Sequence, residues 1–408
     1  MHMNSLLPNG FFPPRAGVVN ACAVGFLQTC VAVALGEQFG PFTYRVVGGE
    51  VEITSYRKDI PGHVDIPPQI DGKPVTAITR LGAEHGFDGA FSQSMISSAT
   101  IPSTVIRIGT QAFGICFHLT SITIPDSVTE IGDDAFYQSN GLRKVTFGKS
   151  VRSIGQRAFF ACFQLTRVAL PDSLQSIGSS AFQGCTGLNR LSFGEDTEFI
   201  GEAAFLGCSS LRALVFPSRL SLMDNNCFRK CQSLHTAVFM GNAPTVTANL
   251  FDTAIPGFRI FFLPEASGFT TPAWRGFRSA ALSRPITPLQ RWMLENGLPI
   301  DTNPLTRIEG SDVCLLLAYA LDLDVERPSA AAALLPDGPA RGIRFRGNRR
   351  DIRYSVEISS NLSEWTEQGV SLTTPDEDGF RTASTAGSGT RVFFRILVTA
   401  PESPAQPD

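Results

Sequence analysis

A phenylalanine recurs at an almost constant interval through the middle of the chain, and this period limits the possible folds more than any other feature. The interval is 22 residues once and 23 residues six times along the series Phe91, Phe113, Phe136, Phe159, Phe182, Phe205, Phe228 and Phe251. A repeat of this length is one small structural unit, and one unit cannot bury its own apolar side chains. The period therefore predicts a solenoid in which successive coils stack and share one core.

Apolar columns around each phenylalanine describe the path of one coil. Apolar residues nine and eleven positions after the phenylalanine, such as Ile122 and Ile124, alternate with polar ones, and a proline or glycine follows. This alternation predicts that each coil adds one short strand to a parallel sheet. An Ile-Gly pair before the phenylalanine predicts a second inward contact, a residue free to turn, and then a short helical or 3₁₀ turn.

The core of the solenoid is expected to contain the phenylalanines and a cysteine three positions later. Five of the nine cysteines occupy this slot, whereas Ser94, Ser139 and Ala254 occupy it in other repeats. The slot thus requires a small buried residue, and we expect free thiols there rather than disulfides or a zinc site. The predicted core ladder comprises Phe113, Phe136, Phe159, Phe182, Phe205, Phe228, Cys162, Cys185 and Cys208.

The repeat resembles the BspA-type leucine-rich repeats of bacteria. Its consensus, clearest at Ile124–Phe147 and Leu170–Phe193, is I-P-x-S-V-x-x-I-G-x-x-A-F-x-x-C-x-x-L-x-x-I-x-F, and the resemblance covers residues 90–262. It implies an α/β solenoid, built as a right-handed leucine-rich-repeat coil with a parallel sheet. A β-hairpin around Gly48-Gly49 is expected to cap its N-terminus, and a small, mainly β domain is expected to follow it.

The flanks of the repeat suggest how the chain is divided. Residues 16–35 are apolar and end in Ala34-Leu35-Gly36, whose small residues suit signal peptidase, so we expect a secreted or cell-surface protein. An uncleaved N-terminus is the alternative. The expected segments are a signal peptide at 1–36, a β cap with a degenerate first coil at 37–89, the leucine-rich-repeat array at 90–272, a linker with short helices at 273–340, a C-terminal β domain at 341–400 and a disordered tail at 401–408.

The C-terminal third has patterns of its own. Helices are predicted at Pro288–Asn296 and at 311–323. Alternation in Arg341–Arg346 and Arg349–Ile358 around Gly347-Asn348 predicts a hairpin with its aromatic and aliphatic side chains inside. Trp365 and a strand at Arg391–Val398 are expected to complete a small β domain.

Part of this region, Gly310–Asp324 and Tyr354–Trp365, is similar to a C-terminal module of exported bacterial repeat proteins and hydrolases. In relatives the acidic loop before the helix looks like a calcium loop. The matching residues are Asp301, Asn303, Glu309 and Asp312, but Leu305 and Arg307 fall where further oxygen ligands would be needed, so no metal is predicted.

Composition and motifs argue against several classes of function. The chain has 34 Lys+Arg and 37 Asp+Glu, a net charge of −3, which gives no basis for nucleic-acid binding. Its five histidines have no metal-ligand spacing, and Gly148-Lys149-Ser150 lacks the glycine that a P-loop requires at position 143. We predict no catalytic residue, no metal, no cofactor and no integral membrane segment in the mature chain. A carbohydrate-active enzyme would need a pair of carboxylates in a convincing context, which we do not find.

The outward face of the predicted sheet is the expected binding surface, because Lys144, Arg167 and Arg190 fall in one row on adjacent strands. Like charges so close repel one another, which favours an anionic ligand, although a charge row is usually a solvated face. The expected binding residues are Lys144, Arg167, Arg190, Arg143, Arg212, Thr146, Ser192, Val215 and Val238. We expect a non-enzymatic recognition protein for a protein or glycan partner; the alternative is an intracellular interaction scaffold. The oligomeric state stays open.

Overall fold

The structure is a computed structural model that describes residues 36–80, 82, 88–252, 257–283, 286–296, 298, 332–334, 341–359, 366–368, 370–376, 379–385 and 393–399. Five predictions lie outside the described residues. They concern residues 1–35 of the signal peptide, the helix at 311–323, the acidic loop, Trp365 and the tail at 401–408.

A small sheet precedes the first coil. Strands β1 (Glu37–Phe39), β2 (Phe42–Val47) and β3 (Glu50–Tyr56) pair antiparallel in that order. Gly48 and Gly49 form the turn of the β2–β3 hairpin with φ angles of 62° and 90°, which glycine adopts without strain. Strand β3 then pairs in parallel with β6 (Lys73–Ile78), and β5 (Gln69–Ile70) pairs with the other part of β6. The predicted hairpin cap is confirmed, and it covers an edge that would otherwise be open.

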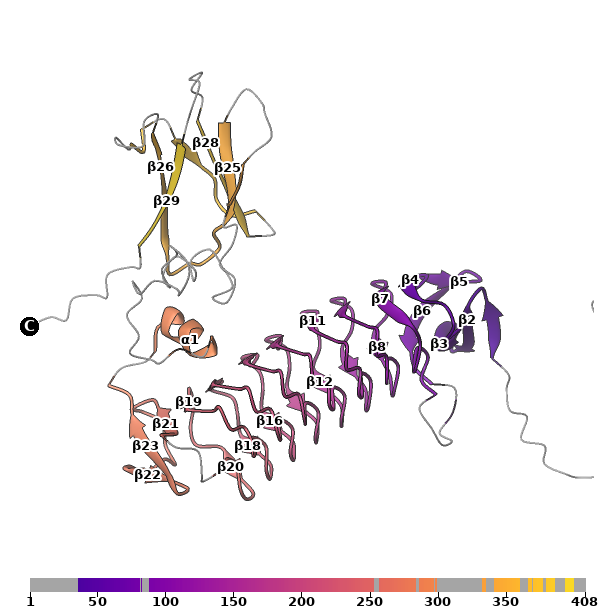
Figure 1. The fold of residues 1–408 in the computed structure, drawn as a ribbon, viewed down its shortest axis with the longest axis horizontal. Helices are drawn as coiled ribbons and strands as arrows, with labels where there is room; N and C mark the ends of the chain where they lie inside the picture. Colours follow the sequence, from indigo (N-terminus) through magenta and orange to yellow (C-terminus); the bar gives the residue numbers. More distant parts are fainter. Residues whose placement is uncertain are drawn as a thin grey trace, which may run out of the picture. The chain divides into compact units, whose positions relative to one another are not determined.

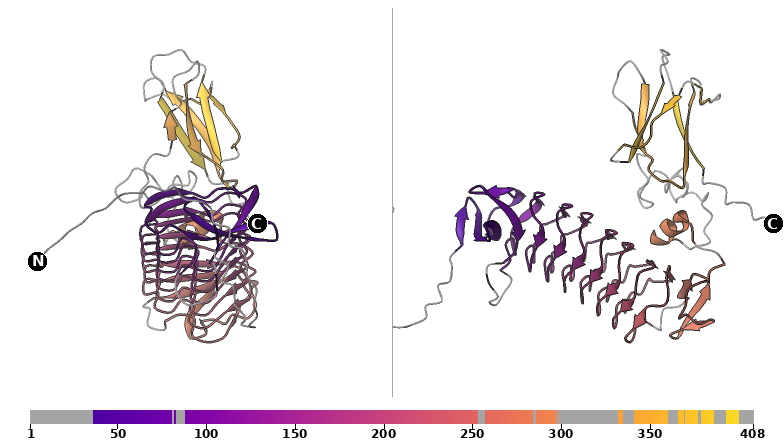
Figure 2. Two further views of the ribbon diagram at one scale, coloured as in Figure 1. Left: turned by 90° about the vertical axis from the view of Figure 1, so that its right-hand side faces the viewer. Right: turned by 180° about the vertical axis from the view of Figure 1, so that it is seen from behind.

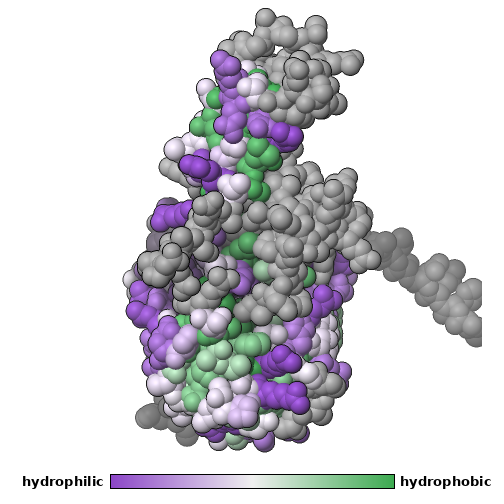
Figure 3. All heavy atoms as spheres, turned by 90° about the vertical axis from the view of Figure 1, so that its left-hand side faces the viewer, coloured by the Kyte–Doolittle hydropathy of each residue, from purple (hydrophilic) through white to green (hydrophobic). Residues whose placement is uncertain are grey.

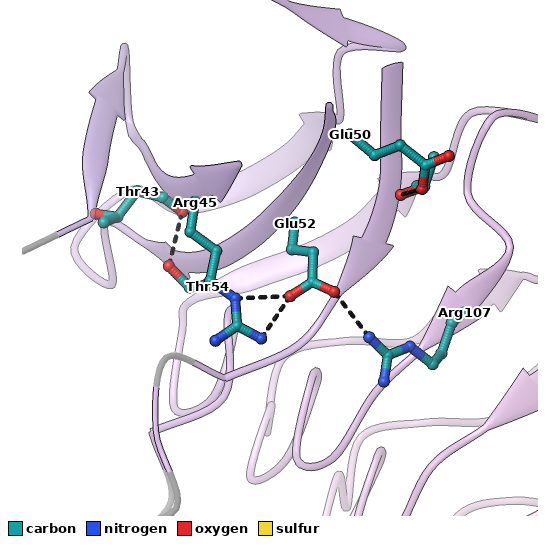
Figure 4. Close-up of polar contacts among 7 residues, drawn as sticks. Thr43, Arg45, Glu50, Glu52, Thr54 and Arg107 are labelled. Atoms are coloured by element: carbon teal, nitrogen blue, oxygen red, sulfur yellow. Dashed lines mark hydrogen bonds and ion pairs between the residues drawn. The ribbon is translucent and has the colours of Figure 1, made fainter. Parts of the chain in front are cut away.

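Charged side chains tie this cap to the first coils (Figure 4). Glu52 of β3 accepts hydrogen bonds from Arg45 Nε at 2.7 Å and from Arg107 Nη2 at 2.9 Å, and Arg107 lies on β8 (Arg107–Ile108). Thr76 Oγ1 of β6 donates to Glu50 Oε2 at 2.9 Å. The Glu52 carboxylate is buried, so its pairing with two guanidinium groups offsets the cost of removing its charge from water.

Two ladders of parallel strands run along the array (Figures 1 and 2). The predicted ladder consists of three groups of paired strands. The first is β4 (Gly62–Asp65) and β7 (Ile96–Thr100), and the second is β9 (Ser121–Thr123), β11 (Lys144–Thr146), β13 (Arg167–Ala169) and β15 (Arg190–Ser192). The third is β17 (Ala213–Phe216), β19 (Thr236–Phe239), β21 (Arg259–Phe262) and β23 (Phe277–Ala281). Residues that are one repeat apart in the sequence lie opposite each other on paired strands, since Lys144 pairs with Arg167 and Arg167 pairs with Arg190. Strand β23, with its antiparallel neighbour β22 (Ala273–Trp274), extends this ladder past residue 272.

The second ladder was not expected as a set of strands. It follows β6 through β8, β10 (Glu130–Ile131), β12 (Ser153–Ile154), β14 (Ser176–Ile177), β16 (Phe199–Ile200), β18 (Leu222–Met223) and β20 (Thr245–Val246). Each strand of this ladder after β6 has two residues, so its alternation is too short to be read from the sequence. The isoleucine of the Ile-Gly pair is its inward residue.

The glycine of that pair has a different role from the one we expected. Gly132 and Gly155 have no positive φ, so they do not supply a left-handed turn. A Cβ on Gly155 would lie 2.6 Å from the carbonyl carbon of Gly132, and one on Gly132 would lie 2.9 Å from that of Gly109. The glycine column is therefore needed because neighbouring backbones approach too closely for a side chain.

The phenylalanine column is a continuous stack of rings. Ring centroids are 4.9 Å apart between Phe136 and Phe159, 5.0 Å between Phe159 and Phe182 and 5.2 Å between Phe182 and Phe205, with the planes within 5° of parallel. All six predicted core phenylalanines are fully buried. Parallel rings at this distance are offset-stacked, which adds to the stabilisation from burial.

The segment that carries each phenylalanine is a series of turns and not a continuous helix. From Phe113 to Phe228, the residues two before and two after each phenylalanine have φ between 51° and 77°. Around Phe159 these residues are Arg157 and Ala161. These residues with positive φ interrupt a helix. They also turn amide groups towards the next coil, so that the Phe159 N–H donates a hydrogen bond to Ala181 O at 2.7 Å. The backbone of the turns thus forms a third ladder of hydrogen bonds.

In the coils that the structure describes, the cysteine slot holds a small hydrogen-bond donor. The Sγ atoms of Cys162, Cys185 and Cys208 lie 3.1 to 3.2 Å from the carbonyl oxygen of the phenylalanine one coil earlier, and Ser139 Oγ donates to Phe113 O at 2.7 Å. The six described cysteines are free and buried, as expected. Burial raises the pKa of the Cys185 thiol to about 12, so the thiol form that donates is the stable one.

The predicted helix in the linker is confirmed as α1 (Pro288–Glu295). Thr287 caps it by accepting a hydrogen bond from the Gln290 amide at 3.2 Å, while Gln290 Oε1 accepts one from the Thr287 amide at 2.9 Å. Such a capping box with proline at the first helical position sets the start of a helix.

The predicted C-terminal hairpin is wrong, although its inward residues are right. Strand β25 (Arg341–Arg346) belongs to a sheet ordered β24 (Ala332–Leu334), β25, β28 (Phe380–Thr385) and β27 (Val370–Leu372), whereas β26 (Arg353–Ser359) pairs only with β29 (Phe393–Thr399) among the described strands. Phe345 and Tyr354 are buried together, with ring centroids 6.2 Å apart. The segment after Gly347 therefore connects two sheets. The apolar faces of β25 and β26 pack against each other, and the two strands do not pair.

Candidate interaction surface

The outer face of the β4–β23 ladder carries the residues expected to bind. In the three-residue strands β9, β11 and β13 the middle residue points into the core, as Val145 and Val168 do, and its neighbours are exposed. Lys144 and Arg167 are exposed side by side on β11 and β13, and Arg190 of β15 is only 7% exposed. Strands in a sheet lie about 4.8 Å apart, so this row holds three cationic side chains close together.

The other expected residues fall into three places. Arg143 Nε donates to Gln164 Oε1 at 2.9 Å next to the row, and Arg212 is exposed. Thr146 is exposed and Ser192 is half-buried on the same face. Val215 and Val238 occupy the same columns but are 1% and 0% exposed. The face is therefore open at β9 to β13 and covered at β17 and β19.

Helix α1 covers this end of the face. Leu294 forms an apolar cluster with Ala213, Val215 and Val238, and Met240, Phe261, Leu282 and Ile286 pack around them. Arg291 forms ion pairs with Glu195 of the array and with Glu295 of its own helix, the second at 3.1 Å. The sequence predicts both the helix and the apolar columns, but no pattern in it indicates that they are in contact.

A polar cluster that we did not predict lies at the N-terminal end of the same ladder. His63 Nδ1 is 2.8 Å from Ser98 Oγ, and His63 Nε2 is 3.1 Å from Asp65 Oδ1 and 3.0 Å from Thr100 Oγ1. Hydrogen bonds from Thr100 and then from His63 lower the pKa of the Asp65 carboxyl. His63 and Asp65 belong to the degenerate first coil, and Ser98 lies one period before Ser121, so a strict alignment of the half-coil to the repeat was the signal that could have located them.

A Ser-His-Asp order within hydrogen-bond distance raises the question of nucleophilic catalysis. His63 and Asp65 are largely exposed on open strands, and His63 shares Nε2 between Asp65 and Thr100. A catalytic serine needs a base held in one orientation and oxyanion donors in a site that excludes water. The exposed polar atoms of this cluster are better suited to accept hydrogen bonds from a bound surface and to donate hydrogen bonds to it.

A cleft of about 290 Å³ lies beside the covered end, lined by both the array and α1. Its polar lining residues are Arg167, Arg190, Ser192, Glu295, Asn296 and Arg349. Burial raises the pKa of the Glu295 carboxyl, and the charge of Arg291 offsets this only in part. Among the described residues no group of three or more His, Cys, Asp and Glu side chains could hold a metal ion.

A second cleft, of about 430 Å³, opens where the array ends. Arg259, Phe261, Pro272 and Arg278 contribute to its lining. Hydrophobic residues lie among hydrophilic ones on this side of the molecule (Figure 3). No helix in the described part of the chain has the length and apolar character that a membrane span requires.

A family model described as a BspA type leucine-rich repeat region matches residues 87–173 and 152–256, with six copies in all. No curated protein matches the chain. The model covers the repeats whose strands, phenylalanine stack and cysteine slot are described above, and sequence pattern and geometry thus agree on the same segment.

Solved structures of bacterial leucine-rich repeat proteins are similar in part. A leucine-rich repeat protein of T. pallidum is 24% identical over 56% of this chain and 85% of that chain, with a TM-score of 0.39. One from Bacteroides ovatus is 23% identical over 55% and 70%, with a TM-score of 0.43. A leucine-rich cell surface protein of Faecalibacterium prausnitzii is 18% identical over 66% and 98%, with a TM-score of 0.24. All three TM-scores lie below 0.5, so the assignment of the repeats rests on the family model and on the geometry.

Proposed function

Because residues 87–256 are a BspA-type leucine-rich repeat region, we propose that this chain recognises a protein partner through the open part of its outer sheet. We define the open strip as the outward residues of β7 to β13, namely Ser98, Thr100, Ser121, Thr123, Lys144, Thr146, Arg167 and Ala169. The observation that carries the proposal is the exposed Lys144 beside Arg167 on adjacent, rigidly paired strands.

The chemistry of the open strip favours a partner with an acidic surface. Two cations on neighbouring strands make the electrostatic potential of this face positive, which attracts a carboxylate. The hydroxyl groups of Thr123 and Thr146 stand beside them and can pair with backbone or side-chain groups of a partner. Since the strands are preformed, little conformational entropy is lost on binding. Recognition needs no chemical step, and we propose a non-enzymatic role.

We propose that the protein acts outside the cytoplasm, at the cell surface or in the medium. The apolar stretch 16–35 and the small residues before Glu37 support a cleaved leader. The test is the mature N-terminus, measured by mass spectrometry on protein from the medium, the envelope and the cytosol of the native host. A chain that starts near Glu37 outside the cytosol supports export, and a cytosolic chain that starts at Met1 contradicts it.

The intracellular scaffold is kept as a second candidate because the described cysteines are free, as expected in a reducing compartment. Burial and raised pKa values protect the same thiols from oxidation elsewhere, for example at Cys185. The measured N-terminus separates the two candidates.

Site-specific photo-crosslinking in the native host tests the binding surface. A benzophenone side chain at Thr146 should capture a partner, and one at Lys149, which is exposed outside the open strip, should not. Adding Lys144→Glu and Arg167→Glu should reduce the capture at least tenfold. The matched control, Lys149→Glu with Arg152→Glu, changes the charge equally and should leave capture unchanged. Equal capture at both positions, or capture that survives the double substitution in the strip, contradicts the proposal.

A further inference from the structure

The apolar end of the outer sheet is an interaction surface with an occupant from the same chain. Helix α1 lies against β15 and β17, where fully buried Leu294 meets Ala213, Val215 and Val238. An ion pair between Arg291 and Glu195 holds the helix at the edge of this seat. We define the seat as Glu195, Ala213, Val215 and Val238.

The composition of the outer face changes where the helix lies. The column that reads Thr123, Thr146 in β9 and β11 becomes Val215, Val238 in β17 and β19. Without a cover, these valines with Met240 and Phe261 would leave an apolar patch in water, which soluble proteins avoid unless it binds something. The seat and α1 are therefore complementary in polarity, with Leu294 against apolar residues and Arg291 against Glu195.

More of the apolar side chains of α1 pack on its other side than on the array. Its Leu289, Trp292 and Met293 belong to the apolar cluster of the C-terminal β strands, together with Phe345, Tyr354 and others. Only Leu294 inserts into the seat on the array. A helix of eight residues is too short to persist alone in water, so it stays folded on whichever surface keeps most of its apolar side chains. If the C-terminal β strands move away from the array, we expect α1 to stay with these strands and the seat to open.

We propose that α1 is a releasable occupant of the seat, and that the seat fits an amphipathic helix presenting one leucine next to an arginine. In the resting chain α1 fills it; a partner that binds the open strip and extends over β15 to β19 must displace α1 and would shift the population to the open form. The value of release for recognition rests on the proposed function, but seating and release themselves can be measured with no partner present.

A cysteine placed in the seat reports its opening. Val238→Cys should react with a thiol reagent only while the seat is open, and Thr146→Cys on the uncovered strands of the same sheet should react at the rate of an exposed thiol. The full chain without an added cysteine gives the background, and peptide mass spectrometry assigns each label. Native Cys185 is buried and reports unfolding of the array.

We expect Val238→Cys to react about a hundredfold or more slowly than Thr146→Cys, as for a site that opens rarely. Adding Leu294→Ala should raise the rate at Val238→Cys about tenfold or more, because truncating a buried leucine weakens its contact by at least that factor. The rates at Thr146→Cys and Cys185 should stay within twofold.

Three results overturn the proposal. Equal rates at Val238→Cys and Thr146→Cys mean that the seat is not occupied. An unchanged rate at Val238→Cys on adding Leu294→Ala means that α1 does not control access. A parallel rise at Cys185 means that the array unfolds instead of releasing a helix. Lys144→Glu changes the open strip at a residue outside the lining of the cleft beside α1 and should not alter the labelling, so failure of the proposed function and failure of this inference give different results.

Discussion

The repeat array and the C-terminal β strands both show alternation of apolar and polar residues, yet only in the array did alternation lead to the right strand pairs. In the array, Lys144 pairs with Arg167 one period later, as expected. In the C-terminal region, Phe345 and Tyr354 face inward as expected, but their strands lie in different sheets. Alternation determines the face of a strand, and the choice of partner needs a second source of information, which the 23-residue period supplied only to the array.

The largest effect that tests this comparison should come from truncating a stacked ring. Phe182→Ala removes a fully buried side chain that stacks on Phe159 and Phe205, and should destabilise the array by about 3–5 kcal/mol. Phe345→Ala is the matched change in the C-terminal strands, and it should lower protection there only. Hydrogen exchange followed by mass spectrometry measures both. A loss of protection in β11 to β15 as large for Phe345→Ala as for Phe182→Ala would contradict the separation of the two cores.

The next effect concerns close backbone approach. Gly155→Ala would place a Cβ 2.6 Å from the backbone of Gly132, which cannot move without shifting a coil, and should cost about 1–3 kcal/mol in urea unfolding. Gly347→Ala would place its Cβ 2.8 Å from Cδ of Arg381, a side-chain atom that can shift without moving a coil, at the expense of the hydrogen bond from Arg381 Nε to Gly347 O. It should cost less than half as much. Equal costs would mean that the stacking distance in the array is not set by backbone contact.

The cysteine slot should show a smaller effect that depends on hydrogen bonding. Cys185→Ser keeps a donor to Phe159 O, as Ser139 does towards Phe113 O, and should change the free energy of unfolding by less than about 0.5 kcal/mol. Cys185→Ala removes the donor and should cost about 1–2 kcal/mol. Thermal unfolding of the two variants checks this. A serine variant less stable than the alanine variant would show that the slot selects for apolar character instead.

The smallest effect should come from a glycine introduced in the turns. Ala161 has φ of 56°, and glycine already stands one and two coils later at Gly184 and Gly207. Ala161→Gly should therefore change stability by less than about 0.5 kcal/mol, since relief of left-handed strain offsets the entropy cost of glycine. Ala158→Gly, at a buried position without positive φ, should cost about 1 kcal/mol. Chemical denaturation of both variants tests this, and equal destabilisation would count against it.

The candidate surface was only partly predictable. The row of Lys144, Arg167 and Arg190 followed from the period, because residues one repeat apart become neighbours. The cluster of His63 with Ser98 did not, since His63 lies 35 residues before Ser98 and this spacing departs from the period. The two-residue strands of the second ladder and the donor role of the cysteine slot also needed coordinates, because both depend on contacts between coils.

The sequence by itself determined the coil, its register, the buried phenylalanines and the row of cations, because a repeated spacing turns one local pattern into a set of spatial neighbours. Only the tertiary structure decided which part of the outer face is open. Val215 and Val238 belong to the same columns as exposed residues, and they are covered because Leu294, more than fifty residues away in the chain, packs on them. A contact between a repeated surface and a single helix has no period, so no pattern in the sequence records it.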